Sequence, residues 1–544
     1  RIIKIEYTTY ERNLINMKSN WIKYVFIIFI IGILIFAVLK IRQDQEEINL
    51  EEQSTSNEEE QVKEIKVGIA GLDTINPILS NNKNVQDITK LIYEPLVNLT
   101  SDYKAEPCLA TEWAKQSDNS YLIKLRENVR WSDGQRFTAE DVRFTIDRLK
   151  EVSSIYSYNV QYVTAIEIMD DYTVKISLDR EVPFFEYYLT FPILSKDYYE
   201  GEDFVTTTKN SQPIGTGKYK ISTVDSSNIV LVKNDSWWDI KNTPLTLETI
   251  TVNLYSSIGE LYNSFKVGNL DLVATDNTSL SEYIGTIGYT PNEMKGRDHT
   301  FLAFNTQNEL LSNIEVRRAI SYSIDKDNIV SSIFNNQAYT SSFPLDYGSW
   351  LYQEGTASSG YNVDQARQVL EEAGWTYRSS SWQKTINRRT QRIELNLLVK
   401  ASDATKVSVA ENIKTQLEAQ GIRINIVQAS DEEYTNRINN KNYDIALCTL
   451  TLSTSPDLTT FFGDGNLANY TNEEITNIMN EVKNTTDENV LKERYSRLIE
   501  IYKSDAPYLS LYNNKYVVAF NSGLVGEKRP NWFCSFYGVE TWYK

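Results

Sequence analysis

The sequence contains few of the side chains that metal binding and histidine-dependent chemistry require. Its 544 residues include one histidine, His299, and three cysteines, Cys108, Cys448 and Cys534. The cysteines lie far apart, and none is in Cys-x-x-Cys spacing, so a zinc site is not expected. A single histidine also removes most chemistry that needs an imidazole base or ligand. We therefore interpret the cysteines as small buried hydrophobes and expect neither a metal nor a cofactor.

Catalytic motifs are also missing. The sequence has no Gly-x-Ser-x-Gly elbow, no phosphate-binding Walker loop and no His-Glu-x-x-His pair. The glycine-rich stretch Pro213–Gly217 lacks a third glycine and a following Lys-Ser or Lys-Thr, which favours a turn. Pairs of acids say nothing about glycoside hydrolysis in so acidic a chain. We expect that the protein is not an enzyme, and an extracellular hydrolase stays as a third alternative.

Excess positive charge is absent as well. The chain has 73 Asp and Glu against 55 Lys and Arg, which gives a formal net charge of −18 at pH 7. An acidic chain without a basic stripe repels a phosphate backbone, so nucleic acid is not an expected partner. The hydrophobic fraction of 41% is ordinary for a globular protein. Because a single core stops growing near about 250–300 residues, the length predicts two or more domains.

One long apolar run lies near the N-terminus. Residues 24–39 carry no charge, and Lys23 and Lys40 flank them. The run is longer than the hydrophobic region of about 7–15 residues in a cleaved signal peptide. Neither an Ala-x-Ala site nor a cysteine follows it directly. We therefore expect an uncleaved transmembrane signal anchor at residues 24–41.

The flanks of this run set its expected orientation. Basic residues precede it and acids soon dominate after it, which favours a cytoplasmic segment 1–23 and a body outside the cell membrane. Residues 42–63 are rich in Glu, Ser, Thr, Asn and Gln and predict an acidic disordered linker. Met17 opens a Met-Lys-Ser sequence typical of a translation start, which would place residues 1–16 upstream of the native protein.

From Ile65 onward, strand-like and helix-like stretches alternate. The clearest unit has alternating apolar residues over 393–399, an apolar helical face over 409–417 and a second alternation over 422–426. Gly421 stands where a left-handed glycine ends a helix. This βαβ pattern predicts a parallel strand pair with a right-handed crossover, within a large mixed α/β protein.

Several motifs resemble one known family in their order and spacing. They are Leu91–Leu96, Pro107–Trp113, Tyr121–Arg126, Val129–Gly134, Phe137–Val142, Asp170–Val174, Pro213–Tyr219, Asn234–Trp238, Gly268–Asp271, Phe304–Thr306, Val316–Asp325, Ala366–Gly374 and Ala506–Pro507. On these motifs, the chain from Ile65 to its C-terminus resembles the bacterial family 5 extracellular solute-binding proteins of ABC transporters. That group includes oligopeptide-, dipeptide- and nickel-binding proteins.

The resemblance implies an α/β fold of two hinged lobes, of the periplasmic-binding-protein type (class II, cluster C). The predicted transmembrane helix would precede it. Lobe one would comprise residues 64–297, with an extra subdomain at about 91–194, and the return segment 505–544. Lobe two would comprise residues 298–504. Most motif residues would then maintain the fold, and the ligand would lie in the cleft between the lobes.

The segment 449–462 is expected to line this cleft. In peptide-binding members of the family, an aspartate in this segment often holds the ligand's ammonium group. Here that position holds Thr454 or Leu452, and the nearest acid, Asp457, corresponds better to a structural position. This departure favours a ligand without a strong cation there, or an ammonium partner elsewhere. The candidate ligand-binding residues are Asp73, Asn76, Tyr347, Trp350, Thr449, Thr451, Ser453, Thr454, Asp457 and Phe461.

The predicted function is that of the extracellular substrate-binding component of an ABC importer. The protein would bind a peptide or similar small solute in the cleft and deliver it to the permease subunits. It would act as a monomer held to the membrane by its N-terminal helix. The alternative is a surface sensor for a signalling peptide that does not transport. The sequence leaves the ligand open among oligopeptides, dipeptides, nickel chelates, sugars and other solutes.

Overall fold

The computed structural model describes residues 32, 37, 40, 63–117, 119–276, 288–345, 348–352, 360–386 and 388–544. Contacts divide the chain into two units, residues 1–62 and 63–544, and the second unit carries the fold. The predicted anchor at 24–41 and linker at 42–63 lie almost wholly outside the described residues. Among the residues that are described, no helix is both long enough and apolar enough to cross a membrane.

A four-stranded sheet lies at the centre of lobe one. Its strands, in order across the sheet, are β1 (Glu64–Ala70), β10 (Thr249–Tyr255), β9 (Asn228–Lys233) and β8 (Tyr219–Val224). β1 and β10 pair in parallel, and the other neighbours are antiparallel. Helix α2 (Lys83–Thr89) comes after β1, and α6 (Ile258–Lys266) comes after β10. Both helices therefore begin near the carboxyl ends of the two parallel strands, where ligands bind in many α/β sheets.

The subdomain of lobe one contains a second sheet. Its strands, in order, are β4 (Ala110–Ser117), β5 (Ser120–Leu125), β7 (Thr173–Leu178) and β6 (Val163–Asp170). The other elements are β2 (Val97–Leu99), β3 (Ala105–Pro107), α3 (Ala139–Glu151), α4 (Ser157–Val160), α5 (Lys196–Tyr199) and the 3-10 helices η1 (Phe185–Leu189) and η2 (Thr208–Ser211). The apolar side chains of β5 and β7 belong to the same continuous core as those of β1 and β10. The subdomain is therefore an extension of lobe one.

Lobe two is a sheet with helices on both faces. The predicted βαβ unit is confirmed: β17 (Glu394–Lys400) and β18 (Arg423–Ala429) are parallel and are joined by α10 (Ala404–Ala419). One face packs against α7 (Ile314–Ser323), α8 (Lys326–Phe334), α9 (Val363–Glu372) and α10. The other face packs against α11 (Asp431–Asn439), α12 (Thr459–Phe462), α13 (Glu473–Val482) and α14 (Glu488–Asp505). The remaining strands are β13 (Ala338–Thr340), β19 (Ile445–Thr451) and the small sheet of β14 (Thr376–Arg378), β15 (Ser381–Ile386) and β16 (Arg389–Arg392).

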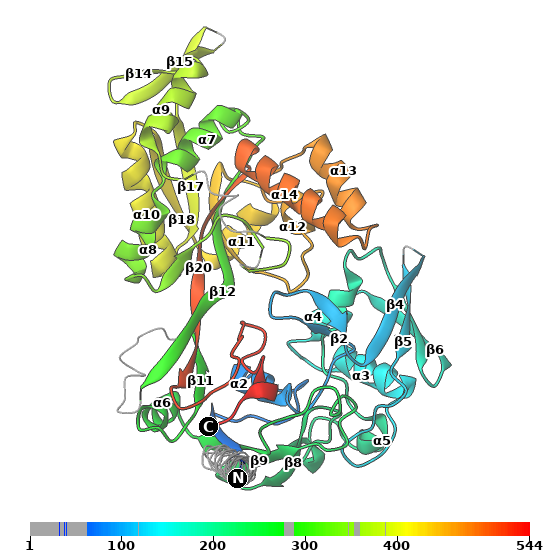
Figure 1. Ribbon diagram of the computed structural model, residues 1–544. Helices are drawn as coiled ribbons and strands as arrows, with labels where there is room; N and C mark the ends of the chain where they lie inside the picture. The colour runs from blue at the N-terminus through cyan, green and yellow to red at the C-terminus, as the bar shows by residue number, and fades with distance from the viewer. Residues whose placement is uncertain are drawn as a thin grey trace, which may run out of the picture. The chain divides into compact units, whose positions relative to one another are not determined.

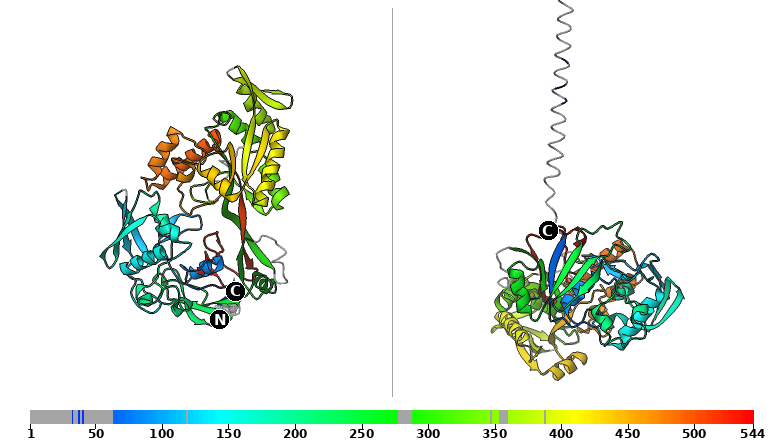
Figure 2. Two further views of the ribbon diagram at one scale, coloured as in Figure 1. Left: turned by 180° about the vertical axis from the view of Figure 1, so that it is seen from behind. Right: turned by 90° about the horizontal axis from the view of Figure 1, so that it is seen from below.

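Two long antiparallel strands, β12 (Tyr289–Phe304) and β20 (Tyr508–Asn521), pass through both lobes. In lobe one β20 pairs with β11 (Leu272–Thr275), and in lobe two β12 pairs with β19. Figure 1 and the left view of Figure 2 show the two strands side by side between the lobes. Their register shifts between Lys295 and His299, which gives the connection a break in its ladder. The predicted limit of lobe one at residue 297 falls within this break.

His299 lies immediately beyond the break and is fully buried. Its Nδ1 lies 3.2 Å from Asn513 Oδ1 and 3.3 Å from Ser341 Oγ, and its Nε2 lies 3.2 Å from Ser510 Oγ. The ring also stacks on Phe301. The pKa of His299 is lowered to about 4, chiefly by burial; the bond to Asn513 opposes the decrease, and the charges of Lys326 and Lys295 add to it. The imidazole is therefore a neutral part of the connection between the lobes at neutral pH.

Two glycines just before β8 allow the backbone to approach closely the residues that follow α2. The amide of Gly217 donates to Ile92 O at 2.8 Å, and the Gly215 carbonyl accepts from Ser132 N at 2.9 Å. A Cβ atom on Gly215 would lie 1.9 Å from the Ile92 carbonyl oxygen, which belongs to the backbone and cannot rotate away. The segment Pro213–Gly217 is irregular and bends at residues 216–217, where the sequence predicts a turn, and it is glycine-rich because two backbones meet there.

Substitution of Gly215 by Ala should destabilise the protein by about 1–3 kcal/mol, because the added methyl overpacks a rigid contact. The free energy of unfolding, from denaturant titration of residues 63–544, measures this. Gly259→Ala is the matched control, since a Cβ there meets nothing closer than Ser257 Oγ at 4.0 Å. Equal stability of the two variants would contradict the close backbone contact.

The only imidazole signal in a nuclear magnetic resonance titration should move with a midpoint near pH 4 rather than near the ordinary 6.5. Because the folded pKa lies below the unfolded one, the stabilisation is complete above pH 6.5 and is lost as the pH falls toward 4. The loss amounts to about 3 kcal/mol. A variant with His299→Gln should lack this contribution, and a midpoint near 6.5 in the folded protein would show that His299 is exposed to water.

Candidate functional site

Two adjoining cavities lie between the lobes. The larger has a volume of about 720 Å³ and the smaller about 450 Å³, and both are within the size range of small-molecule sites. Three residues line both cavities: Arg297, Thr451 and Trp532. They come from the crossing strand β12, from the end of β19 and from the C-terminal segment. We refer to the two cavities together as the cleft.

Arg297 forms the wall that the two cavities share. Its side chain is 3% exposed, and its guanidinium donates to the Leu452 carbonyl, with Nε at 2.8 Å. The Leu452 amide in turn donates to the Arg297 carbonyl at 2.9 Å. The guanidinium also lies over the rings of Tyr103 and Trp532. Arg297 therefore fixes the chain that leaves β19 and places a permanent positive charge at the centre of the cleft.

The larger cavity lies over the carboxyl ends of the parallel strands of lobe one. Its wall includes the end of β1 at Ala70, the start of α2 and the start of α6. Lys83 adds a second cation, which binds Asp87 at 2.7 Å and lies over the ring of Trp532 at 5.1 Å. Asp298 lines the same cavity and accepts from Thr451 Oγ1 at 2.8 Å. This cavity therefore offers charges of both signs on rigid elements.

The smaller cavity lies between the segment that follows β19 and the subdomain of lobe one. Leu450 to Ser455 and Asp457 line it from lobe two, and Tyr158 and Tyr188 line it from the subdomain. Asp457 accepts from Thr459 N at 3.0 Å and from Thr459 Oγ1 at 2.6 Å. Burial raises the pKa of Asp457, and these hydrogen bonds oppose the increase only in part.

The structure places five of the ten candidate ligand-binding residues on the cleft: Thr451, Ser453, Thr454, Asp457 and Phe461. Asp73, Asn76, Trp350 and Thr449 line neither cavity. Tyr347 lies outside the described residues.

The other side chains have structural partners. Asp73 accepts from Ser80 Oγ and Asn81 N within its own loop. Asn76 is fully buried and its amide donates to Asn210 Oδ1. Thr449 Oγ1 lies 2.8 Å from Thr300 Oγ1 on the neighbouring strand.

Trp350 belongs to a second contact between the lobes. Its amide donates to Asp102 O at 3.0 Å, and its indole Nε1 donates to Tyr187 OH at 3.2 Å. Trp350 was a candidate because it is aromatic. In the structure its side chain forms a contact between the lobes and does not line the cleft.

Ion pairs accompany this second contact. Glu181 of the subdomain accepts from Lys115 at 2.7 Å and from Lys483, at the end of α13, at 2.9 Å. These two ammonium groups lower the pKa of Glu181. Lys104 of lobe one binds Glu488, the first residue of α14, at 2.6 Å. We call Trp350 and the pairs of Glu181 with Lys483 and of Lys104 with Glu488 the clasp, because they join the subdomain to lobe two away from β12 and β20.

Sequence reasoning missed several residues that line the cleft: Lys83, Tyr158, Tyr188, Arg297, Asp298, Asn514 and Trp532. Arg297 and Asp298 lie at the predicted boundary between the lobes. A charged residue at such a boundary can be predicted to line the cleft. The tyrosines lie in a short helix and a 3-10 turn of the subdomain, and no periodic pattern marks them.

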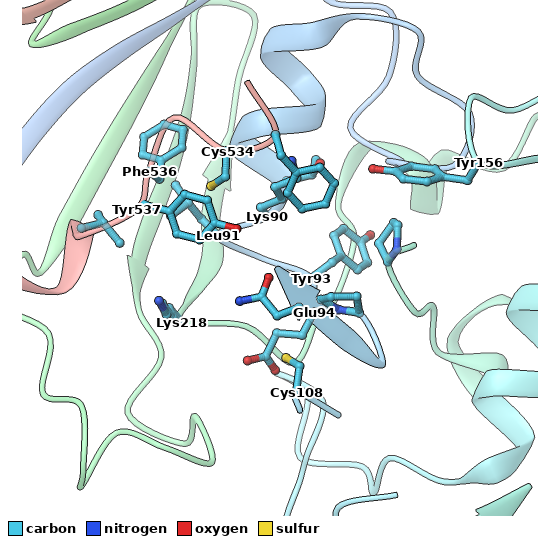
Figure 3. Close-up of a pocket in the computed structure, with 16 residues that line it drawn as sticks. Lys90, Leu91, Tyr93, Glu94, Cys108, Tyr156, Lys218, Cys534, Phe536 and Tyr537 are labelled. Carbon is cyan, nitrogen blue, oxygen red and sulfur yellow. The ribbon is translucent and has the colours of Figure 1, made fainter. Parts of the chain in front are cut away.

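A third cavity lies inside lobe one and shares no lining residue with the cleft. Its volume is about 100 Å³, room for only a few water molecules. In Figure 3 the side chains of Cys534, Phe536 and Tyr537 lie toward one end and those of Glu94 and Cys108 toward the other. Burial raises the pKa of Glu94, which accepts from the indoles of Trp237 and Trp238. These bonds serve the core of lobe one.

Comparison with known proteins gives consistent results. The sequence profile of the bacterial extracellular solute-binding proteins, family 5 Middle, matches residues 104–469. Oligopeptide-binding protein AppA of Bacillus subtilis is 22% identical over 521 residues, which cover 91% of this chain and 94% of that protein. Heme-binding protein A of Haemophilus influenzae is 23% identical, with 80% of this chain and 84% of that protein covered.

Solved structures share the fold. HbpA2 from Haemophilus parasuis has a TM-score of 0.72 at 20% identity, covering 87% of this chain and 99% of the other. The unliganded open form of MppA, a periplasmic murein tripeptide binding protein, has a TM-score of 0.74 at 18% identity, covering 89% of this chain and 97% of the other. The two-lobed α/β fold and the match over residues 104–469 together show that this chain belongs to the bacterial extracellular solute-binding proteins of family 5.

Proposed function

We propose that this protein is the substrate-binding component of an ABC importer, which takes up a peptide or similar small solute in the cleft and delivers it unchanged to permease subunits. The proposal includes a monomer that residues 24–41 hold on the outer face of the cell membrane. The observation that carries it is the pair of adjoining cavities of about 720 and 450 Å³ between two lobes that β12 and β20 connect. Such a site can exclude water around a solute when the lobes close.

The lining of the cleft supports a polar, extended solute. Hydroxyl side chains of Thr451, Ser453 and Thr454 follow one another along the wall, and Arg297 stands between the two cavities. A peptide carries amides and charges that such groups can bind. The relatives bind different solutes according to their names, which include oligopeptides, dipeptides and heme. The choice of a peptide therefore rests on the polarity and the length of the cleft.

The alternative function is a surface sensor for a signalling peptide. The predicted signal anchor supports this alternative, because a receptor as well as a transport component can be held to the membrane by an uncleaved helix. A purified permease complex that accepts solute from this protein would favour transport. A partner of the signalling class would favour sensing.

Residues 63–544, purified gently and then denatured, should release a small solute that mass spectrometry identifies. Adding that solute back to refolded protein at about 100 times its dissociation constant should raise the stability by about 2.7 kcal/mol. The recovered solute should be chemically unchanged after long incubation. Steady formation of a product would contradict the binding function and favour the hydrolase alternative.

Charge reversal in the clasp, Glu181→Lys, should separate the lobes of the solute-free protein. Three lysines would then face one another across a contact that exposed ion pairs stabilise by only about 0.2–1 kcal/mol each. Small-angle scattering should report an increased radius of gyration. Glu167→Lys is the matched control, because within the described part of the chain Glu167 forms its ion pair, at 3.6 Å, with Lys175 of the same subdomain. An unchanged radius in both variants would show that the clasp does not hold the lobes together.

A further inference from the structure

One segment of lobe two is strongly basic in an otherwise acidic chain. Residues 376–392 contain five basic and no acidic residues, whereas the whole chain has a formal net charge of −18. The segment forms the small sheet of β14, β15 and β16. Figure 1 and the left view of Figure 2 show β14 and β15 at the end of lobe two farthest from lobe one. The basic residues are therefore concentrated at one extremity of the protein.

This small sheet packs with one face and exposes the other. Tyr377 and Trp382 lie opposite each other on the packed face, where Trp382 is buried. Lys384 belongs to the same face and donates to a backbone carbonyl at 2.7 Å. Side chains alternate between the faces of a strand, so Arg378 and Arg392 project from the opposite face, and both are exposed.

The positive charge of this sheet is not neutralised within the protein. Its exposed arginines, which we call the basic patch, are Arg378, Arg388, Arg389 and Arg392. None of the four guanidinium groups has a carboxylate partner in the part of the chain that the structure describes. Acids on neighbouring elements bind elsewhere: Glu309 accepts from Gln391 at 2.7 Å, and Glu394 lies 3.8 Å from Arg423. Because a guanidinium is always protonated, the patch keeps its full charge.

The chemistry of the patch fits phosphate groups. A guanidinium binds two oxygens of a phosphate at once, with charge-assisted hydrogen bonds. Hydroxyl side chains that can donate to further oxygens are exposed on the same face as Arg378 and Arg392. They are Thr376, Thr385 and Thr390.

The predicted membrane anchor favours lipid headgroups as the source of these phosphates. The linker predicted at residues 42–63 leads directly into β1 of lobe one. A chain of that length reaches at most about 75 Å when fully extended. The bilayer would therefore stay within reach of the body, and a tethered surface has a high effective concentration.

We propose that the basic patch docks on the anionic phosphate headgroups of the membrane surface. The proposal goes beyond the function proposed above and takes from it only the anchor that selects the occupant. Since the linker joins lobe one and the patch belongs to lobe two, the protein is held to the bilayer at both lobes. Both lobes then stay close to the membrane that contains the permease subunits.

The experiment measures sedimentation of residues 63–544 with lipid vesicles, because this unit carries the fold and lacks the anchor. Vesicles of phosphatidylglycerol and phosphatidylcholine in equal parts should bind about 100-fold more tightly than vesicles of phosphatidylcholine alone. Each basic residue near an anionic surface contributes about fivefold, so Arg378→Gln combined with Arg392→Gln should weaken binding about 25-fold. Salt at about 1 M, where the Debye length is about 3 Å, should abolish it.

Arg130→Gln combined with Arg136→Gln is the matched control. These two arginines are exposed, lie opposite each other across an antiparallel bridge of lobe one, and give the same change of charge. This variant should bind as the wild-type protein does.

Three results would overturn the docking proposal. They are equal binding of the wild-type protein to the two kinds of vesicle, unchanged binding of the patch variant, and retention of polyglutamate without binding to vesicles. The last result would assign the patch to an acidic protein. The vesicle comparison with wild-type protein remains decisive even if a variant does not fold. The assay needs no solute, so its failure and a failure of the proposed substrate-binding function are separate results.

Discussion

The pairing of β12 with β20 is the constraint on which the rest of the structure depends. Each strand is continuous through both lobes, so each lobe takes part of its sheet from the same two strands. Between Lys295 and His299 the register of the two strands shifts, and their ladder is interrupted there over several residues. A ladder resists stretching and shearing but bends where hydrogen bonds are missing. The break also explains why Arg297 is at the centre of the cleft. Arg297 lies within this break, where its carbonyl accepts from the Leu452 amide and its guanidinium donates to the Leu452 carbonyl.

The two connections between the lobes differ in strength. The strands contribute many backbone hydrogen bonds, whereas the clasp contributes side-chain pairs such as Lys104 with Glu488, each of which is partly exposed to solvent. Exposed pairs are worth little and are screened by salt. The clasp can therefore keep the lobes near each other without fixing the angle between them. A solute that touches both walls can then favour the closed state if its differential affinity for that state exceeds what such pairs supply. The fully buried core of each lobe does not take part in that choice.

Much of the fold can be predicted from the sequence, and much less of the site. Periodicity over 393–426 predicts the parallel unit β17-α10-β18, because a strand and a helix each bury one face at a fixed period. The cleft has no such period. Its lining comes from the ends of strands and from short turns far apart in the chain, such as Tyr158, Arg297 and Trp532. The segment from Thr451 to Phe461 was found because a family resemblance pointed to it. Asp73 follows the first strand and Trp350 is an aromatic residue after the helix pair of lobe two, but their side chains complete a loop and a contact between the lobes.

Charge decides how the two halves of the cleft differ. Arg297 lines both cavities, and its guanidinium donates to the Leu452 carbonyl and lies over two aromatic rings. Lys83 is paired with Asp87, which leaves less of its charge for a ligand. Asp457 lines the smaller cavity and accepts hydrogen bonds from Thr459. The cleft therefore presents side chains of opposite charge, with Arg297 on the shared wall and Asp457 in the smaller cavity. Because both side chains belong to strands and turns of the fold, a solute with complementary charges would be oriented by them.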